Sequence, residues 1–343
     1  MTNADSALTS RVGVRDGGVR RSPRRFVAPW WVRRIGGGFC TLIAVSILIF
    51  LATQVLPGDA AKSILGRDAT PERLSALRAQ LGLDRPAIEQ YLSWAGNFLT
   101  GDFGQSLANG RNVGEVLIPR ATNTLALARC AIAIALPVSI LLGSLSAARR
   151  DGPLDQGIVV TSLTFNALPE FVIGLGLVVI FSTGLFKVLP AVSLFPPEES
   201  AFSNPMALVL PTLALVLAIS PYLIRLVRAS LIDALDSEYV LTARLRGVPE
   251  RRIMTHHALR NSMTPVIHGT ALLLAYLAGG IVVIEYVFRF PGLGGLLLEA
   301  VSSRDLPLIQ ATALLLAALY VVVNLAADLL VVRLTPRLRG VGA

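Results

Sequence analysis

The chain alternates long apolar runs with shorter polar connections that contain most of its arginines. A helix needs about 20 apolar residues to cross the hydrocarbon core of a bilayer. Six runs meet this requirement: residues 35–56, 123–147, 158–188, 206–226, 265–287 and 308–331. Pro169 lies inside the third run, where it removes a helical hydrogen bond and is expected to kink or break the span. The pattern predicts an all-α membrane protein with six transmembrane helices.

The connection between the first two runs, residues 58–121, is polar but patterned, and we expect it to fold as a small helical cap. Thr70 can cap a helix that starts at Pro71 and ends before Gly82. A second helix is expected from Pro86, with apolar residues at helical spacing that would pack on the helices beneath it. These residues are Ile88, Tyr91, Leu92, Ala95 and Phe98.

The resulting division has five parts. Residues 1–29 form an Arg-rich tail that we expect to be disordered, and residues 30–57 carry the first transmembrane helix. The cap follows, and then a five-helix core over residues 122–334. Residues 335–343 form a second tail. Trp30 and Trp31 fit an aromatic belt at the membrane interface.

Composition and charge agree with a membrane protein and indicate its orientation. Apolar residues make up 53% of the 343 positions, whereas only 15% are charged, and the net charge is +9. The two tails and the second and fourth connections contain about twice as many Lys and Arg as the opposite side, so the positive-inside rule predicts that both termini are cytoplasmic. Because topology accounts for the positive charge, and no basic surface is interleaved with aromatic residues, nucleic-acid binding is not expected.

The polar segment 238–261 lies on the predicted cytoplasmic side and has its own local pattern. A helix-forming run ends at Gly247, a residue that adopts the left-handed conformation at little cost, and Pro249 can open the next helix. This pattern predicts two short helices joined by a sharp elbow. A protruding polar elbow between apolar spans is suited to docking a soluble partner.

Ordered motifs across the chain resemble a known family. The segment contains Glu238, Ala243 and Gly247, followed by His257-Ala-Leu-Arg-Asn261 and Pro265. Further motifs are Leu56-Pro-Gly-Asp59, Leu81-Gly-Leu-Asp84-Arg-Pro86, Gly101-Asp-Phe-Gly104-Gln-Ser106, Arg120 with Thr122 and Thr124-Leu125, Glu285 to Gly294, and Arg304-Asp305. Their order and spacing resemble permease subunits of the oligopeptide/dipeptide/nickel branch of binding-protein-dependent ATP-binding-cassette importers. The resemblance extends from about residue 30 to residue 334.

The resemblance implies a type I importer permease fold and a set of partners. These are a second homologous permease, two ATP-binding-cassette ATPases and an extracytoplasmic substrate-binding protein, all assembled in the plasma membrane. The segment 238–261 would be the coupling loop that contacts an ATPase, through Glu238, Tyr239, Ala243, Arg244, Arg246, Gly247, Arg251 and Arg252. The small side chain of Ala243 would allow close approach of the ATPase, and the arginines could pair with its acidic residues. A set of residues that orient the loop would comprise His257, Arg260, Asn261 and Pro265.

Ionisable residues inside apolar spans are costly in lipid and are candidates for function. Glu170, with Phe171 beside it, is a candidate for the pore because it follows the break at Pro169, near the cytoplasmic third of its helix. Glu285 and Phe288 are candidates for a gate or a partner contact. Structural pairing and a position at the membrane interface are the alternatives for Glu170. We expect Arg129 to reach water near a span end and Asp328 to form a salt bridge with a basic loop.

No chemistry of catalysis or cofactor binding is evident. The chain has no Gly-rich phosphate loop ending in Gly-Lys-Ser/Thr, so ATP and Mg²⁺ are expected on the partner ATPases and no cofactor on this chain. His256 and His257 are adjacent and would point about 100° apart on a helix, which disfavours a shared metal ion. Cys40 and Cys130 fall within spans, so a disulfide framework is not expected.

Four classes of function remain to be compared. The interpretation that fits the motifs is a peptide importer permease, with a nickel-chelate or other small-solute importer as the alternative. An ion-driven carrier or channel would be favoured by mid-membrane charges and inverted repeats, which the sequence does not show clearly. A structural scaffold would not explain the polar elbow, and an intramembrane enzyme would need paired catalytic groups.

Overall fold

A computed structural model describes residues 30–55, 70–72, 74–75 and 85–334. The described part is helical apart from its connections and one isolated bridge between Gln105 and Asn112. Its long helices are α1 (Trp30–Val55), α4 (Ala87–Thr100), α5 (Val113–Ala148), α6 (Pro153–Ala167), α7 (Glu170–Val178), α8 (Pro205–Leu235), α11 (Leu259–Val287), α12 (Leu293–Ser303) and α13 (Leu306–Leu334). The shorter elements are α9 (Glu238–Leu245), α10 (Glu250–Arg252), the π-helical turns η2 (Val179–Thr183) and η4 (Ile253–Ala258), and the 3₁₀ turn η3 (Ala201–Ser203).

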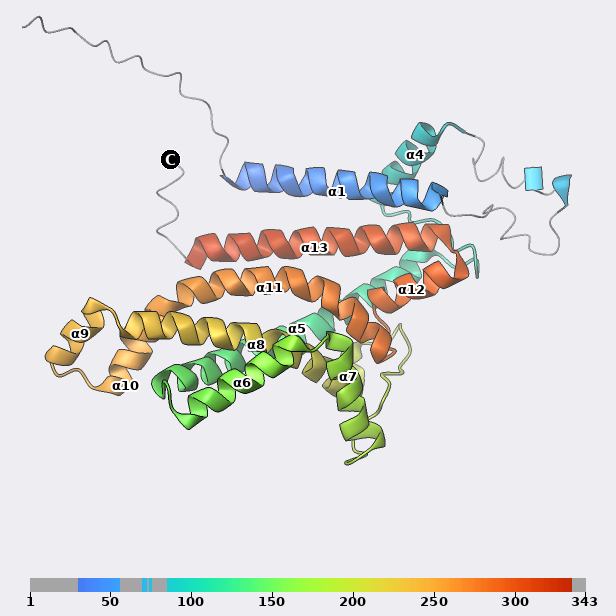
Figure 1. The fold of residues 1–343 in the computed structure, drawn as a ribbon. Coiled ribbons are helices and arrows are strands. Elements are labelled where there is room, and N and C mark those ends of the chain that lie inside the picture. Colours follow the sequence, from blue (N-terminus) through green and yellow to red (C-terminus); the bar gives the residue numbers. More distant parts are fainter. Residues whose placement is uncertain (1–29, 56–69, 73, 76–84, 335–343) are drawn as a thin grey trace, which may run out of the picture.

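The long helices lie side by side and run back and forth between two ends (Figure 1). Helix α1 starts, and α13 finishes, at the end where α9 and α10 lie; we call this the α9 end. Helices α4 and α12 lie at the other end, which we call the α4 end. Four helices in the described part are long and apolar enough to cross a membrane, or up to six if each of two bent pairs counts as one span. The fold is therefore an all-α membrane fold.

The structure refines the predicted spans at their ends. Helix α5 begins at Val113, ten residues before the predicted second span, so the helical core includes part of the segment assigned to the cap. The break predicted at Pro169 is present, because α6 ends at Ala167 and α7 starts at Glu170 at an angle of 104°. The fifth pass begins well before Pro265 and bends by 56° between Leu274 and Gly279.

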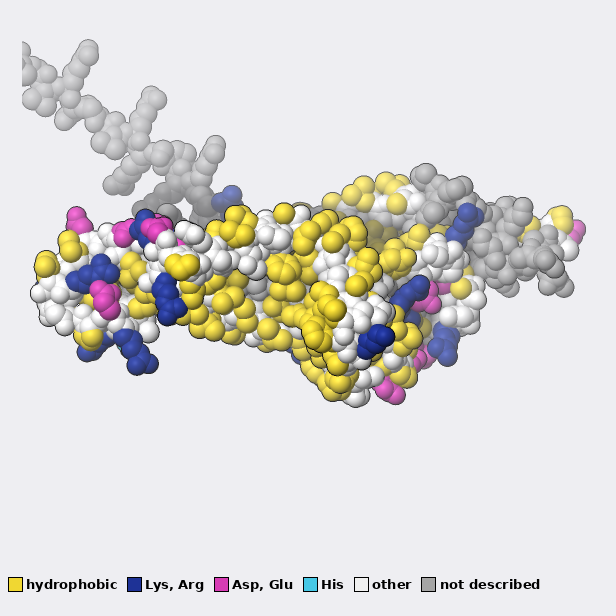
Figure 2. All heavy atoms as spheres, turned by 60° about the horizontal axis from the view of Figure 1, so that its bottom comes forward, with side chains coloured by type: hydrophobic (Ala, Val, Ile, Leu, Met, Phe, Trp, Pro, Cys, Tyr) yellow, Lys and Arg dark blue, Asp and Glu magenta, His cyan; other side chains and the backbone are white. Residues whose placement is uncertain are grey.

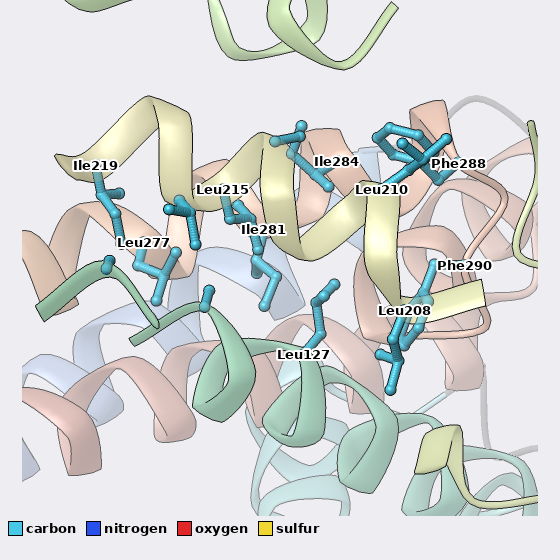
Figure 3. Close-up of a cluster of buried hydrophobic side chains, with 14 of the residues drawn as sticks. Leu127, Leu208, Leu210, Leu215, Ile219, Leu277, Ile281, Ile284, Phe288 and Phe290 are labelled. Atoms are coloured by element: carbon cyan, nitrogen blue, oxygen red, sulfur yellow. The ribbon is translucent and has the colours of Figure 1, made fainter. Parts of the chain in front are cut away.

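The main core lies where α5, α8 and α11 meet (Figure 3). Large apolar side chains from these three helices are fully or almost fully buried there, including Leu127, Leu215 and Ile284. Gly143 lets α5 approach α8 closely, since a Cβ atom at this position would lie 2.8 Å from the carbonyl oxygen of Ile224. Close backbone approach of this kind is how helices gain packing energy in lipid, where the hydrophobic effect does not drive their association.

Helix α4 crosses the end of α1 and is held there by aromatic rings. Phe50 of α1 contacts Tyr91 and Trp94, with ring centroids 5.5 and 6.1 Å apart, and Phe98 continues the series to Phe103. One face of the second cap helix therefore packs as predicted. Its other face does not: Ile88 and Leu92, which were expected to pack inward, are 67% and 62% exposed.

Other parts of the predicted cap and the tails lie outside the described residues. These parts are the two tails, the Leu56-Pro-Gly-Asp59 motif and most of the first cap helix, including Leu77, Leu81 and Gly82. The start of that helix is described, and the amide of Leu74 donates to the carbonyl of Thr70 at 2.9 Å. The side chains of Trp30 and Trp31 are also outside the description, so the aromatic belt stays a prediction.

The surface has the charge distribution of a membrane protein (Figure 2). Hydrophobic side chains cover the middle of the visible face, whereas Lys, Arg, Asp and Glu gather at the two ends. Large apolar residues along α1 are exposed in the single chain, among them Phe39 at 63% and Leu48 at 64%. Exposed surface of this composition is suited to contact with lipid or with another membrane subunit.

Candidate functional site

The candidate site is the segment at the α9 end that contains α9, the elbow and α10. Gly247 lies two residues after the last residue of α9 and has φ = +77°. Its amide donates to the carbonyl of Arg244 at 2.9 Å. Pro249 then precedes α10. The predicted pair of short helices with a left-handed elbow at Gly247 is confirmed. We refer to residues 238–252 as the α9–α10 loop.

The loop has a small hydrophobic core of its own. Val240 and Ile253 are fully buried, and Ala243 is buried between them. The small side chain of Ala243 therefore makes room for this chain's own η4 segment. The expectation that Ala243 lies on the surface that an ATPase approaches is wrong in this structure, because the residue points into the loop.

The outward side of the loop combines apolar and basic side chains. Tyr239 is 42% exposed and Leu245 is 82% exposed. Glu238, Arg246, Arg251 and Arg252 are exposed as well, as expected for residues that could contact a partner. Large apolar side chains that protrude from a polar surface are typical of protein interaction sites.

Arg244, which was predicted to pair with acids of an ATPase, forms an ion pair within its own loop. Its guanidinium contacts the carboxylate of Glu250 across the elbow, with an Nε–Oε1 distance of 2.6 Å, and this contact raises the pKa of Arg244. The ion pair spans the two short helices and so stabilises the shape of the elbow. Behind it lies a hollow of about 220 Å³, between the end of α5, the end of α8 and the loop.

The residues predicted to orient the loop lie at the start of the long fifth pass. Arg260, Asn261 and Pro265 are exposed, and His257 is half-buried. Within the described ranges none of these side chains forms a hydrogen bond or an ion pair, so their orienting role stays a prediction. Ser262, between them, is buried and donates to the carbonyl of Leu259 at 2.9 Å.

A buried ion pair anchors the helix that leads into the loop. Asp155 at the start of α6 is 2% exposed and accepts from Nε and Nη2 of Arg228 on α8, at 2.7 and 2.6 Å. It also accepts from the hydroxyl of Ser146 on α5 and from the amide of Asp151 at 2.9 Å. Sequence reasoning missed this cluster, because an acid at a helix start and an arginine beyond a span each have ordinary explanations.

Glu285 and Phe288 do not form a gate. Glu285 is fully buried, accepting from Thr124 of α5 at 2.5 Å and from the amide of Gly294 at the start of α12 at 2.7 Å. Phe288 is fully buried in the main core. The prediction of a pore or gate role is wrong for both residues in this structure. The carboxylate instead holds the first turn of α12, where unpaired amides need acceptors.

A second buried carboxylate at the α4 end joins two motifs that are 199 residues apart. Asp305 is fully buried, and it accepts from the hydroxyl of Ser106 and from the amide of Leu107 at 3.1 Å. It also accepts from the amide of Ala108 and from the amide of Leu308 in the first turn of α13, both at 3.3 Å. The Gly101–Ser106 and Arg304-Asp305 motifs therefore form one structural unit.

Glu170 is placed differently from Glu285. It is the first residue of α7, directly after the break, and it is half-buried, while Phe171 next to it is 51% exposed. Helix α6, which separates Glu170 from the α9 end, has 15 residues and a length of about 22 Å. The depth of Glu170 in the membrane and its role in the pore stay predictions.

The remaining polar candidates have ordinary environments. Asp328 forms the expected salt bridge, but its partner at 3.0 Å is Arg34 in helix α1 and not a residue of a loop. Arg129 is exposed. Both cysteines are free thiols. His256 contacts the hydroxyl of Thr255, and no cluster of potential metal ligands occurs among the described residues.

Comparisons with known proteins agree with this architecture. Residues 139–340 match the family described as binding-protein-dependent transport system inner membrane component, and residues 27–128 match the N-terminal family of the same membrane components. A putative peptide transport system permease protein of Brucella abortus is 35% identical over 308 residues, which is 90% of this chain and 98% of that protein.

Two further relatives are named as glutathione transport system permease proteins. The relative from Pectobacterium atrosepticum is 34% identical over 310 residues, and the one from Escherichia coli K12 is 34% identical over 308 residues. In both cases the match covers 90% of this chain and 98% of the relative. The chain belongs to the binding-protein-dependent transport system inner membrane component family, the multi-pass membrane permease subunits of ATP-binding-cassette importers.

Proposed function

We propose that this chain is a permease subunit of an ATP-driven peptide importer. Relatives that align over nearly their whole length are named for peptide and glutathione transport, and glutathione is itself a short peptide. These names support peptides over nickel chelates as the substrate. The transporter would contain a second, homologous permease, two ATPases and an extracytoplasmic binding protein.

The observation that carries the coupling role is the exposure of the α9–α10 loop. The loop protrudes at one end of the bundle, has its own core, and presents Tyr239, Leu245 and several arginines outward. An ATPase that docks on this surface could move α8 as a lever, because the loop follows α8 directly. The α9 end would then be cytoplasmic, as the distribution of Lys and Arg predicts.

Transport would proceed by alternating access. ATP binding closes the two ATPases, the loops of both permeases move with them, and the helix bundle opens to the outside, where the binding protein delivers peptide. Each ligand shifts this equilibrium only by its difference in affinity between the two states. ATP and Mg²⁺ bind to the ATPases in this scheme, and no cofactor is assigned to this chain.

The experiment that tests the proposed substrate is uptake of labelled peptides of different lengths. Cells that lack this gene are compared with the same cells carrying it again. Loss of uptake in the first strain and recovery in the second are expected. Unchanged peptide uptake, together with loss of uptake of a nickel chelate, would contradict the proposal while leaving the importer architecture in place.

A further inference from the structure

The two bent spans meet at the carboxylate of Glu170, which lies against Gly280 of α11. The break between α6 and α7 places Glu170 at the start of α7, and Tyr276 lies in the bend of α11 between Leu274 and Gly279. Tyr276 and Gly280 are four residues apart on α11 and so share a face of that helix. Gly280 makes room for the carboxylate of Glu170, because a Cβ atom there would come within 2.6 Å of its Oε1.

The carboxylate of Glu170 has no cationic partner among the described residues. Arg225, the arginine that contacts the end of α6, donates instead to the amide oxygen of Asn166 at 3.1 Å and to the carbonyl of Pro221 at 3.3 Å. The buried carboxylates of Asp155 and Glu285, by contrast, accept hydrogen bonds from neighbouring donors. Glu170 therefore has capacity for a positively charged ligand from outside this subunit.

The surroundings of Glu170 are open to the surface of the subunit. Phe171 is 51% exposed, and Leu272 and Tyr276, one turn apart on α11, are 68% and 56% exposed. A carboxylate deep in a span is costly when it faces lipid, and such residues usually face a water-filled path. Tyrosine likewise prefers membrane interfaces to the hydrocarbon core. This face is thus suited to border the transport path between the two permeases.

The broken backbone between α6 and α7 also favours a cation at this position. The carbonyls in the last turn of α6 carry partial negative charge, which favours a cation at the break. One of them, the carbonyl of Phe165, also accepts from the amide of Leu168 at 3.3 Å. The N-terminal turn of α7 favours the ionised form of Glu170, because its amides carry partial positive charge. Backbone carbonyls at broken spans bind cations in other transporters.

We propose that Glu170 and Tyr276, with the carbonyls at the end of α6, bind the amino group of a peptide as it crosses this permease. The inference rests on the proposed peptide import for the identity of the ligand. The existence of a water-filled, cation-selective position at the break does not depend on peptide import. The two parts can therefore be tested separately.

The first measurement tests the position without any peptide. Phe171→Cys is introduced into the complete transporter, with Cys40 and Cys130 replaced by Ser, and its rate of reaction with cationic and anionic methanethiosulfonate reagents is compared. We expect the cationic reagent to react faster, and the ratio of the two rates to fall about tenfold when Glu170→Gln is added, since a nearby charge of this kind is worth at least that factor. Glu199→Gln, at an exposed acid, is the matched control and should leave the ratio unchanged.

The outcomes of this measurement are distinct. An unreactive thiol in the Phe171→Cys variant would place the side chain in lipid or in a closed subunit contact and would overturn the inference. An unchanged ratio when Glu170→Gln is added would overturn it too, because a cation from the partner permease would then already neutralise the carboxylate.

The second measurement identifies the ligand. The Phe171→Cys transporter is labelled with the cationic reagent in the presence of a free tripeptide or its N-acetyl form, together with the binding protein and ATP. We expect the free tripeptide to slow labelling several-fold more than the acetylated one, and Glu170→Gln to abolish this difference. Equal protection by both peptides, in a transporter whose cation preference is intact, would overturn the assignment to the amino group without affecting the importer function.

Discussion

The two ends of this bundle contain motifs of similar polarity, but they use them in opposite ways. At the α9 end, Tyr239, Leu245 and the arginines of the loop are exposed, and one ion pair holds the elbow. At the α4 end, Glu285 and Asp305 are fully buried and hold the starts of α12 and α13. A polar motif in a membrane chain can thus serve docking or internal support, and burial distinguishes the two.

The largest effect is expected from Asp155→Ala, which would leave Arg228 without its carboxylate in a partly buried site. Breaking a buried pair from one side costs about 3–5 kcal/mol. We expect the variant to be poorly inserted or to lose its folded form at a clearly lower temperature in detergent, measured by size-exclusion chromatography after heating. The control is Asp236→Ala, whose ion pair with Arg150 is exposed. Equal thermal stability of the two variants would contradict the supporting role of Asp155.

Asp305→Ala should have the next largest effect. The change removes one acceptor from the hydroxyl of Ser106 and from the amides of Leu107 and Leu308, and a buried donor left without its partner costs about 1–3 kcal/mol. The loss should appear as faster proteolysis of the 101–112 segment in membrane vesicles. Ser106→Ala alone should show a smaller increase in the cleavage rate. Proteolysis at the wild-type rate in Asp305→Ala would show that the two motifs do not support each other.

Local features of this fold could be predicted from the sequence, whereas contacts between distant residues could not. The apolar helices, the break at Pro169 and the elbow at Gly247 follow from local rules on hydrophobic length, proline and positive φ. The structure confirms the break and the elbow and shows four to six candidate spans. The roles of Glu285 and Ala243 depend on which residues pack against them, and those residues are distant in the chain or follow a turn. The sequence marked Glu285 as unusual, but only the contacts with Thr124 and Gly294 show that it is structural.

At the α9 end, the expected effects on stability are smaller and those on function are larger. Leu245→Ala removes the most exposed large apolar side chain of the loop and should leave folding unchanged within about 0.5 kcal/mol. Tyr239→Ala is expected to do the same. Each should lower the affinity of the ATPase for the permease, measured by titrating purified ATPase onto permease in nanodiscs. Wild-type affinity in the double variant would place the docking surface elsewhere.

The smallest effect is expected from Arg244→Ala, which removes the ion pair to Glu250. The pair is exposed, and such pairs contribute about 0–1 kcal/mol. The effect should shrink as the salt concentration rises, because the interaction is screened. We expect a small increase in the ATPase dissociation constant at low salt and little change at high salt. A large loss at all salt concentrations would show that Arg244 contacts the ATPase directly.

The central claim is that the α9–α10 loop passes the motion of the ATPases to the helix bundle, and Gly247→Asp tests it most directly. The φ of +77° at position 247 disfavours residues with a Cβ atom, at a cost of about 1–2 kcal/mol. An added Cβ atom would have no atom within 4 Å, so it would not clash. The variant should therefore be inserted with a distorted elbow. Peptide uptake and ATP hydrolysis are measured together in proteoliposomes with the complete transporter. We expect ATP hydrolysis to continue while peptide uptake falls at least tenfold. Wild-type peptide uptake per ATP hydrolysed would contradict the coupling role of the loop.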